Sequence, residues 1–333
     1  MKVLVTGGAG YIGSHVVRQL GEAGHEVVVF DNLSTGHDWA VTHGELVVGD
    51  LADPGAIESL FQSHRFEAVL HFAAHIVVPE SVSNPLKYYS NNTRNTLNLL
   101  MALEKHRVPR LVFSSTAAVY GMPEKTLLDE KTPLSPINPY GASKMMSERM
   151  ITDSADASGL DYVILRYFNV AGADPQTRLG QATPEATHLI KVACECATGA
   201  RGGMQVFGTD YATRDGTCVR DYIHVEDLAA AHIRALEHMA RGGESSILNC
   251  GYGRGFTVRE VIETVKRLSG VDFPVTDVPR RPGDPEALMA DNQKIRAVLD
   301  WTPRHDDLDT IVQTALDWER HWQQRNHPDN HSC

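Results

Sequence analysis

Residues 1–13 read MKVLVTGGAGYIG, and they give the first indication of the fold. An apolar, β-branched run at Val3–Thr6 leads into glycines at positions 7, 8, 10 and 13, and a helix-patterned segment follows at Ile12–Leu20. Glycines permit a tight turn and a close backbone approach to a pyrophosphate, which then binds at the positive end of the helix. The stretch therefore predicts a strand, a phosphate-binding turn and a helix.

The same kind of apolar run recurs along the chain, with amphipathic segments between most of the runs. The further runs are Glu26–Phe30, Glu45–Val48, Ala68–Phe72, Arg110–Ser114, Tyr162–Arg166 and Ser246–Asn249. The further helical segments are Asn91–Lys105, Lys144–Asp156 and Asp227–Met239. Alternation of buried-looking strands with helices predicts an α/β fold, a doubly wound parallel Rossmann sheet of about seven strands.

The regular alternation breaks after about Asn169. Residues 170–223 are rich in Gly, Asp, Thr and Pro, and Val271–Pro285 is a second irregular stretch before a helical segment near Asp307–Gln324. We predict a Rossmann domain, which carries the glycine turn, from 1–170 and 224–250, and a smaller, discontinuous α+β substrate domain from 171–223 and 251–325. Residues 326–333 are predicted to form a flexible tail. The smaller domain would cover the carboxyl ends of the strands, where such sheets bind ligands.

Composition excludes several classes of protein. With 42% hydrophobic and 22% charged residues, the 333-residue chain is typical of a globular protein. The net charge of −11 and the lack of a basic cluster argue against nucleic acid as a partner. No apolar run approaches the ~20 residues that span a membrane. Five cysteines without a C-x-x-C pair favour reduced thiols and a cytoplasmic location, and disfavour a zinc site.

One histidine pair has a spacing that can bind a metal ion on a helix. His71 and His75 have i, i+4 spacing, but they lie in a strand and its exit rather than on a helix. In a strand the two side chains share a face but lie too far apart to bind one ion. We therefore predict no metal.

Acidic residues follow the second and third strands. Asp31 lies 18 residues beyond Gly13, the place where a carboxylate binds the adenosine ribose hydroxyls and repels a 2′-phosphate. No Arg or Lys occurs in residues 32–38, so NAD is favoured over NADP. Asp50, with Leu51 beside it, is placed to face the adenine. Asp50 could instead, or at the same time, cap a helix that begins at Ala52 or Pro54.

A Tyr-x-x-x-Lys motif supplies the candidate catalytic pair. Tyr140 and Lys144 share one face at the start of a helix, and a nearby ammonium favours the phenolate of a tyrosine. Tyr140 is therefore the candidate general base, and Lys144 tunes its pKa. A hydroxyl at the end of the strand Arg110–Ser114 would pass the proton. Spacing favours Thr116, with Ser115 as a competitor, and either could simply be a turn residue.

These residues occur within longer motifs. They include 6–13 (TGGAGYIG), 71–74 (HFAA), 114–121 (SSTAAVYG), 166–173 (RYFNVAGA) and 281–284 (RPGD). The most specific is 215–225 (DGTCVRDYIHV). In these motifs the chain resembles the extended short-chain dehydrogenase/reductase superfamily. Within its NAD-dependent epimerase/dehydratase family, the chain resembles the UDP-glucose 4-epimerases over almost its whole length.

The resemblance implies an isomerase that uses bound NAD without net consumption and interconverts UDP-galactose and UDP-glucose through a 4-keto sugar. Tyr140 would take the proton of the sugar O4, and the keto sugar would turn over about its diphosphate before hydride returns. The resemblance also implies a homodimer that pairs the helices at 91–105 and 144–156. The alternative is that these helices only cover the sheet.

The resemblance carries over the remaining site residues. The expected cofactor contacts are Gly7, Gly10, Tyr11, Ile12, Gly13, Asp31, Asn32, Asp50, Leu51, Phe72, Ala73, Ala74, Asn91, Ser114, Tyr140, Lys144, Tyr167 and Phe168. The expected substrate contacts are Thr116, Tyr140, Asn169, His188, Leu189, Phe207, Arg220, Arg281, Asp284 and Leu288. Arg220 and Arg281 would hold the diphosphate, although a surface salt bridge is the simpler alternative.

Two positions depart from the family pattern. Ile76 stands where some members carry a lysine near the cofactor, and His188 stands where some carry an asparagine on the substrate phosphate. Leu288, intermediate in size, lines the sugar pocket and leaves N-acetylated or uronic acid UDP-sugars open as substrates. A dehydratase would need acidic residues where Ala117 and Ala118 stand. A decarboxylase and a non-catalytic NAD-sensing protein remain alternatives.

Overall fold

The computed structural model describes residues 1–281 and 283–326. Its centre is a seven-stranded sheet in the order β12-β7-β5-β4-β1-β2-β3, and all neighbouring strands run parallel. The strands are β1 (Lys2–Thr6), β2 (Glu26–Asp31), β3 (Glu45–Val48), β4 (Ala68–His71), β5 (Arg110–Thr116), β7 (Asp161–Tyr167) and β12 (Ser246–Cys250). They are the seven strands predicted from the sequence, so the α/β prediction is confirmed.

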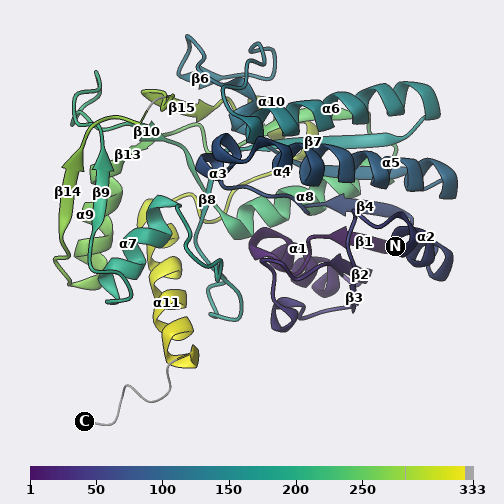
Figure 1. Cartoon of the computed structure of the whole chain (residues 1–333), viewed down its shortest axis with the longest axis horizontal. Helices are drawn as coiled ribbons and strands as arrows, with labels where there is room; N and C mark the ends of the chain where they lie inside the picture. The colour runs from purple at the N-terminus through teal and green to yellow at the C-terminus, as the bar shows by residue number, and fades with distance from the viewer. Residues whose placement is uncertain (282, 327–333) are drawn as a thin grey trace.

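Helices cover both faces of this sheet (Figure 1). On β1, Val3 and Val5 join a core with Val16 of α1, whereas the intervening Leu4 joins a second core with Leu99 of α5. This alternation is the reason that both faces of β1 are buried. One face carries α1 (Tyr11–Glu22) and α8 (Val225–Ala240), and the other carries α2 (Pro54–Ser63), α5 (Asn95–His106) and α6 (Pro139–Ser158).

Three smaller sheets accompany the central one. They are formed by β13 (Phe256–Thr257), β10 (Val219–Arg220), β15 (Ala287–Ala290) and β6 (Leu127–Leu128); by β8 (Asn169–Ala171) and β11 (Tyr222–His224); and by β9 (Met204–Phe207) and β14 (Val275–Val278). In Figure 1, β9 and β14 are on the left, β6 and β15 at the top, and β8 near the middle. The stretch 271–285 was predicted to be irregular, but it contains β14, which pairs with β9. Strand β6 pairs with β15 although it comes from the segment 1–170.

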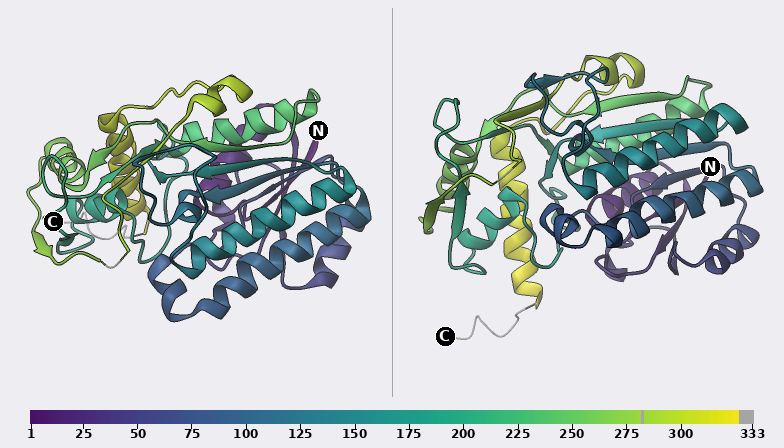
Figure 2. Two further views of the ribbon diagram at one scale, coloured as in Figure 1. Left: turned by 90° about the horizontal axis from the view of Figure 1, so that it is seen from above. Right: turned by 45° about the horizontal axis from the view of Figure 1, so that its top comes forward.

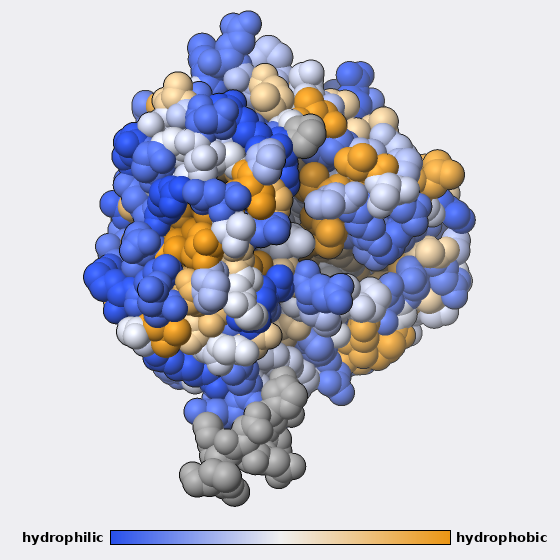
Figure 3. Space-filling model, turned by 60° about the vertical axis from the view of Figure 1, so that its left-hand side comes forward, coloured by the Kyte–Doolittle hydropathy of each residue, from blue (hydrophilic) through white to orange (hydrophobic). Residues whose placement is uncertain are grey.

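Helices α7 (Leu189–Ala197), α9 (Val258–Ser269) and α11 (Leu308–Asn326) pack together next to these sheets, and α10 (Gln293–Leu299) packs on α8 and β12. Two views show this helical group on the opposite side of the molecule from α2 (Figures 1 and 2). Hydrophilic residues cover most of the face turned forward in Figure 3, and apolar residues form separate patches there.

Short helical segments complete the fold. They are η1 (Asp38–Ala40), α3 (Val78–Ser83), α4 (Pro85–Tyr88), the π-helical η2 (Tyr89–Arg94) and η3 (Ala117–Tyr120). The helix predicted at 91–105 is present, but η2 forms its first turn. The predicted tail begins within α11, at Asn326, and the rest of it, 327–333 with Cys333, lies outside the described residues. Among the described residues, no helix is long and apolar enough to cross a membrane.

Candidate functional site

A cavity of about 1960 Å³ opens at the carboxyl ends of the central strands. It is lined by every residue that the sequence predicted for the site except Ser114 and Lys144. The predicted cofactor and substrate residues therefore face one continuous space, although they come from segments as far apart as the glycine turn and β15. This agrees with the rule that doubly wound sheets place ligands outside the carboxyl ends of their strands.

The glycine turn leaves room for a ligand. Gly7 has a φ of +72°, and a Cβ there would lie 2.6 Å from the backbone nitrogen of Ala73. A Cβ on Gly13 would lie 2.2 Å from the carbonyl oxygen of Gly7, whereas one on Gly10 would meet only that oxygen, at 3.3 Å. Gly10 is the N-cap of α1 and has no side chain to cap the helix. The free N–H groups of the first turn therefore fit an anionic pyrophosphate.

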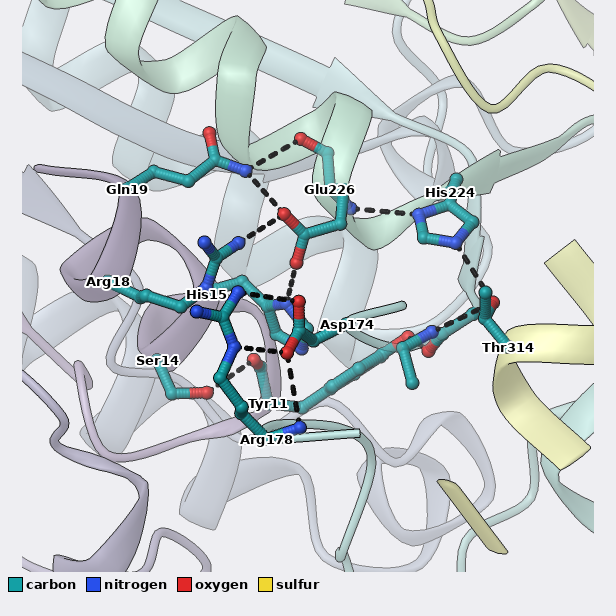
Figure 4. A network of polar contacts seen from close by, with 12 residues as sticks. Tyr11, Ser14, His15, Arg18, Gln19, Asp174, Arg178, His224, Glu226 and Thr314 are labelled. Atoms are coloured by element: carbon teal, nitrogen blue, oxygen red, sulfur yellow. Dashed lines mark hydrogen bonds and ion pairs between the residues drawn. The ribbon is translucent and has the colours of Figure 1, made fainter. Parts of the chain in front are cut away.

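A network of buried charges fixes α1 behind this turn (Figure 4). Glu226 of α8 pairs with His15 and Arg18 of α1. The Tyr11 hydroxyl at the start of α1 donates to the carbonyl of Gly172 at 2.6 Å. Farther along, the ring of His224 lies 3.0 Å from the Thr314 hydroxyl of α11. The helix that begins at the glycine turn is thus held to the part of the chain that forms the smaller sheets.

Asp31 lies at the end of β2 and faces the cavity. Its two oxygens accept hydrogen bonds from the backbone N–H groups of Ala9, at 3.0 Å, and Leu33, at 2.9 Å. Burial raises the pKa of the Asp31 carboxyl, and the two hydrogen bonds oppose that rise. The carboxylate is therefore fixed against the glycine turn, and its remaining lone pairs can accept ribose hydroxyls.

Asp50 also lines the cavity, and its carboxylate accepts from the Asn32 amide at 3.0 Å. The helix-capping alternative for Asp50 is wrong, because the N-cap of α2 is Asp53, which accepts from the N–H groups of Gly55 and Ala56. The backbone N–H that donates to the Asp50 carboxylate is that of Ala52, which lies ahead of the helix.

Tyr140 and Thr116 meet at the cavity wall. Burial raises the pKa of the Tyr140 phenol well above its ordinary value, and the Thr116 hydroxyl lowers it. Thr116 accepts from the N–H of Ala118 at 3.1 Å, so it caps η3 and still has its own O–H to donate. Its competitor Ser115 is fully buried and donates to Glu148 at 2.5 Å. The geometry thus distinguishes the two hydroxyls, and Thr116 is the one that faces the cavity.

Lys144 lies behind this wall rather than in it. Its ammonium donates to the Ser114 carbonyl at 2.8 Å and lies 4.6 Å from the centre of the Phe113 ring. Burial lowers the pKa of Lys144 to about 7, and the charge of Glu148 opposes the shift. Ser114 itself donates to the Tyr167 hydroxyl at 3.1 Å. Both residues missing from the cavity lining therefore support it from behind.

The two arginines lie on the other side of the cavity. Arg220 lies 3.7 Å from a carboxylate oxygen of Asp284, and Arg281 donates to the other oxygen at 3.2 Å. The Arg281 guanidinium also lies 4.3 Å from the centre of the Phe207 ring. The salt-bridge alternative holds in part, since both cations share one carboxylate. All four residues line the cavity, so the pairing leaves two cations at its wall.

His188 and its neighbours complete that side. Its Nδ1 lies 2.9 Å from the amide nitrogen of Gln181, and burial lowers the pKa of the ring. Asn169 donates to the backbone carbonyl of Asp221 at 3.3 Å. Leu189 and Leu288 add apolar surface to the cavity.

Some residues that line the cavity were not predicted from the sequence. Ser34, Thr35 and Gly36 face the cavity, and their position directly after Asp31 was a usable signal. Lys87 also lines it and pairs with Glu80 at 2.5 Å. Lys87 is thus a cation in the same cavity as Ile76, the position where the family lysine is missing.

His71 has a structural place. Its ring lies 2.6 Å from the Thr6 hydroxyl and 3.0 Å from that of Thr96, and burial lowers its pKa to about 3. In residues 1–281 and 283–326, no group of three or more His, Cys, Asp or Glu side chains is arranged to hold a metal ion.

Comparison with known proteins places this site in a family. Residues 3–251 match the model of the NAD dependent epimerase/dehydratase family. The chain belongs to this family. It is 56% identical to a UDP-glucose 4-epimerase of Azospirillum brasilense over 324 residues, which are 97% of this chain and 93% of the relative.

Two solved structures are similar over nearly the whole chain. One is a UDP-glucose 4-epimerase from Brucella ovis in complex with NAD, with a TM-score of 0.93, 46% identity and coverage of 95% of this chain and 97% of the other. The second is a UDP-Glc/GlcNAc 4-epimerase from Campylobacter jejuni, with a TM-score of 0.85, 50% identity and coverage of 96% and 99%.

Proposed function

We propose that this family member is a UDP-glucose 4-epimerase that interconverts UDP-galactose and UDP-glucose with tightly bound NAD. The observation that carries the proposal is that one cavity joins three features. These are a glycine turn with an acidic partner, a buried tyrosine beside a threonine, and two arginines at the opposite wall. The similarity to UDP-glucose 4-epimerases over nearly the whole chain supports it.

The described residues fit NAD. The first turn of α1 would bind the pyrophosphate, and Asp31 would accept the ribose hydroxyls and repel a 2′-phosphate. Asn32, Asp50 and Leu51 would lie near the adenosine. Phe72, Ala73, Ala74, Asn91, Tyr167 and Phe168 would line the remaining length of the cofactor. NAD⁺ supplies this cavity with a hydride acceptor and a positive charge.

Tyr140 is the acid/base residue in this proposal. Because burial keeps its phenol protonated at neutral pH, deprotonation requires added positive charge and a hydrogen bond to the phenolate. Thr116 can donate that hydrogen bond and relay the proton of the sugar O4. Lys144, with a pKa of about 7, is partly charged near neutrality. Its ammonium donates to the carbonyl of Ser114, and the hydroxyl of Ser114 donates to the hydroxyl of Tyr167 at the cavity. We infer that Lys144 tunes the pKa of Tyr140 from behind the wall.

Arg220 and Arg281 would anchor the diphosphate of the substrate, and Asp284 and Phe207 would contact the uridine. A diphosphate fits because the two guanidinium groups already converge on one anion, the Asp284 carboxylate. Asn169, His188 and Leu189 would complete this end. Anchoring the nucleotide alone leaves the sugar free to present either face to the cofactor, as an epimerase requires.

The direct test is to incubate the purified protein with UDP-galactose, without added NAD, and to measure UDP-glucose. The proposal predicts conversion. Absence of conversion even after NAD⁺ is supplied would overturn it.

A second candidate substrate class is the N-acetylated UDP-sugars. Leu288 lines the cavity and is intermediate in size, and the similar Campylobacter jejuni protein is a UDP-Glc/GlcNAc 4-epimerase. The comparison to make is turnover of UDP-N-acetylglucosamine against UDP-galactose. Turnover of the N-acetylated sugar at or above that of UDP-galactose would reject the glucose/galactose assignment.

We also infer a homodimer through α3, α4, α5 and α6. Helices α5 and α6 lie side by side (Figure 2), and these four helices expose large apolar side chains. These are Val82, Leu86, Leu97, Met101 and Met146. Leu86 is 76% exposed, which is unusual for a leucine that has no partner. Analytical ultracentrifugation should show a dimer for the wild type and a monomer for Met101→Glu. A monomeric wild type would contradict the inference.

A further inference from the structure

Three tryptophans form a cluster between the cofactor side of the cavity and the C-terminal helix. Trp39 belongs to η1, and Trp318 and Trp322 belong to α11. The ring of Trp39 lies 5.9 Å from that of Trp318 and 5.2 Å from that of Trp322. The guanidinium of Arg325 lies 4.6 Å from the centre of the Trp39 ring. We call Trp39, Trp318 and Trp322 the indole cluster.

Trp39 follows a loop, residues 32–37, that forms part of the cavity wall. Residues 34–36 of this loop line the cavity next to Asp31. The start of the loop is held by Asp31, which accepts from Leu33, and its middle rests on the glycine turn, where His37 donates to the carbonyl of Ala9 at 2.9 Å. Asn32, Ser34 and Thr35 are exposed, so the loop has little apolar contact of its own. Its far end is held by the contacts of Trp39 and by the ring of His37, which stacks on Trp39 at 5.2 Å and lies 5.9 Å from the ring of Trp322.

Trp318, one of the two indole rings that Trp39 contacts, is buried and hydrogen-bonded. Trp318 is 2% exposed and donates from its indole nitrogen to the carbonyl of Gln181 at 3.1 Å. A Cβ on Gly180 would lie 2.3 Å from the Trp318 ring, so the backbone packs directly on the indole. Gln181 in turn contacts His188 in the cavity. Helix α11 thus bridges the loop after Asp31 and the predicted substrate side.

We propose that Trp39 is a positioning residue that holds the loop at 32–37 closed over the adenosine end of bound NAD and so slows its release. The inference rests on the proposed use of NAD. For the cofactor to leave past this loop, the loop must move away from α11, and that motion separates Trp39 from both indoles and from Arg325. Aromatic and cation–π contacts of this kind add attraction beyond the burial of area.

The test is the rate at which bound NAD⁺ leaves the protein. The holoenzyme is mixed with a large excess of carbon-14-labelled NAD⁺, and bound label is followed with time by rapid gel filtration. Trp39→Ala should release NAD⁺ about tenfold faster than the wild type, a change of about 1.4 kcal/mol in the barrier. Its activity should fall after desalting and return when NAD⁺ is added, which a general loss of structure would not give.

Two further variants make the test specific. Trp39→Phe keeps an aromatic ring and should release NAD⁺ within about threefold of the wild-type rate. Trp322→Ala removes the partner ring from α11 without changing the loop, and it should also accelerate release. A wild-type release rate in Trp39→Ala would overturn the proposal. The proposal would also be overturned if Trp39→Ala released NAD⁺ fast and Trp322→Ala released it at the wild-type rate. Contact of Trp39 with α11 would then not be what slows NAD⁺ release.

The wild-type protein separates this inference from the proposed function. If it contains no NAD as purified and takes up no labelled NAD⁺, the proposed function fails. If it retains NAD and Trp39→Ala retains it equally long, only the role of Trp39 fails.

Discussion

Replacing Glu148 by glutamine removes a buried charge next to the part of the cavity wall that holds Tyr140 and Thr116. Glu148 and Arg166 are each 3% exposed. Arg166 donates to the carboxylate from Nε at 3.1 Å and from Nη2 at 2.6 Å, and Ser115 donates at 2.5 Å. Glutamine keeps the shape but leaves the buried guanidinium without its counter-charge. Within residues 1–281 and 283–326, the only other hydrogen bond of the Arg166 guanidinium is to the Tyr120 hydroxyl, at 3.0 Å.

The magnitude follows from these contacts. Breaking a buried ion pair by removing one partner costs about 3–5 kcal/mol. The glutamine oxygen can still accept one hydrogen bond, which returns about 1 kcal/mol. We therefore expect Glu148→Gln to lower the free energy of unfolding by about 2–4 kcal/mol.

The same helix offers a matched control. Arg149 and Asp153 of α6 form a pair at 2.7 Å with side chains 78% and 58% exposed. Asp153→Asn should cost less than about 1 kcal/mol, because solvent screens the pair. Urea unfolding of both variants, followed by circular dichroism, gives the comparison. A cost for Glu148→Gln within about 1 kcal/mol of that for Asp153→Asn would refute the reasoning.

Three further variants test the site and its surroundings. Tyr140→Phe should reduce turnover of UDP-galactose by about 100-fold or more and leave NAD bound; near-wild-type turnover would show that Tyr140 is not the base. Gly13→Ala places a Cβ 2.2 Å from the Gly7 carbonyl oxygen and should lower NAD content and the unfolding midpoint, whereas Gly202→Ala, with no atom within 4 Å of the added carbon, should leave the midpoint unchanged. Burial lowers the pKa of His71 to about 3, so on acidification the unfolded chain binds a proton near pH 6.5 and the native chain does not. Stability should therefore fall between pH 6.5 and 3, by up to about 1.4 kcal/mol per pH unit from this residue. In His71→Asn, urea unfolding at pH 6.5 and 4.5 should show a dependence smaller by about one proton, and an unchanged dependence would contradict this assignment.

The central sheet was predictable because its strands, apart from the edge strand β3, are buried on both faces. Each of the seven strands is an apolar run, and the observed bounds differ from the predicted ones by no more than two residues at either end. Asp31 and Thr116 could be placed because the rule for parallel sheets puts the carboxyl ends of strands at the cavity. At these positions, local sequence and the topology of the sheet are enough to predict where the side chain lies.

The features that the sequence did not predict depend on residues distant in the chain. Strand β14 lies in a stretch rich in Pro and Arg, and it is a strand only because Met204–Phe207 pairs with it. The position of Lys144 behind the wall depends on the Ser114 carbonyl of β5, 30 residues away in sequence. Trp39 and Trp318 are separated by most of the chain, so their contact leaves no local pattern.

The proposed reaction transfers the hydrogen of the sugar C4 to NAD⁺ as hydride and returns the same hydrogen to C4 within one cavity. The most direct measurement uses UDP-galactose carrying deuterium at C4 and follows the label in the UDP-glucose formed, by nuclear magnetic resonance. We expect the deuterium to remain at C4 of the product and not to appear in water. Conversion with loss of the deuterium to solvent would contradict it.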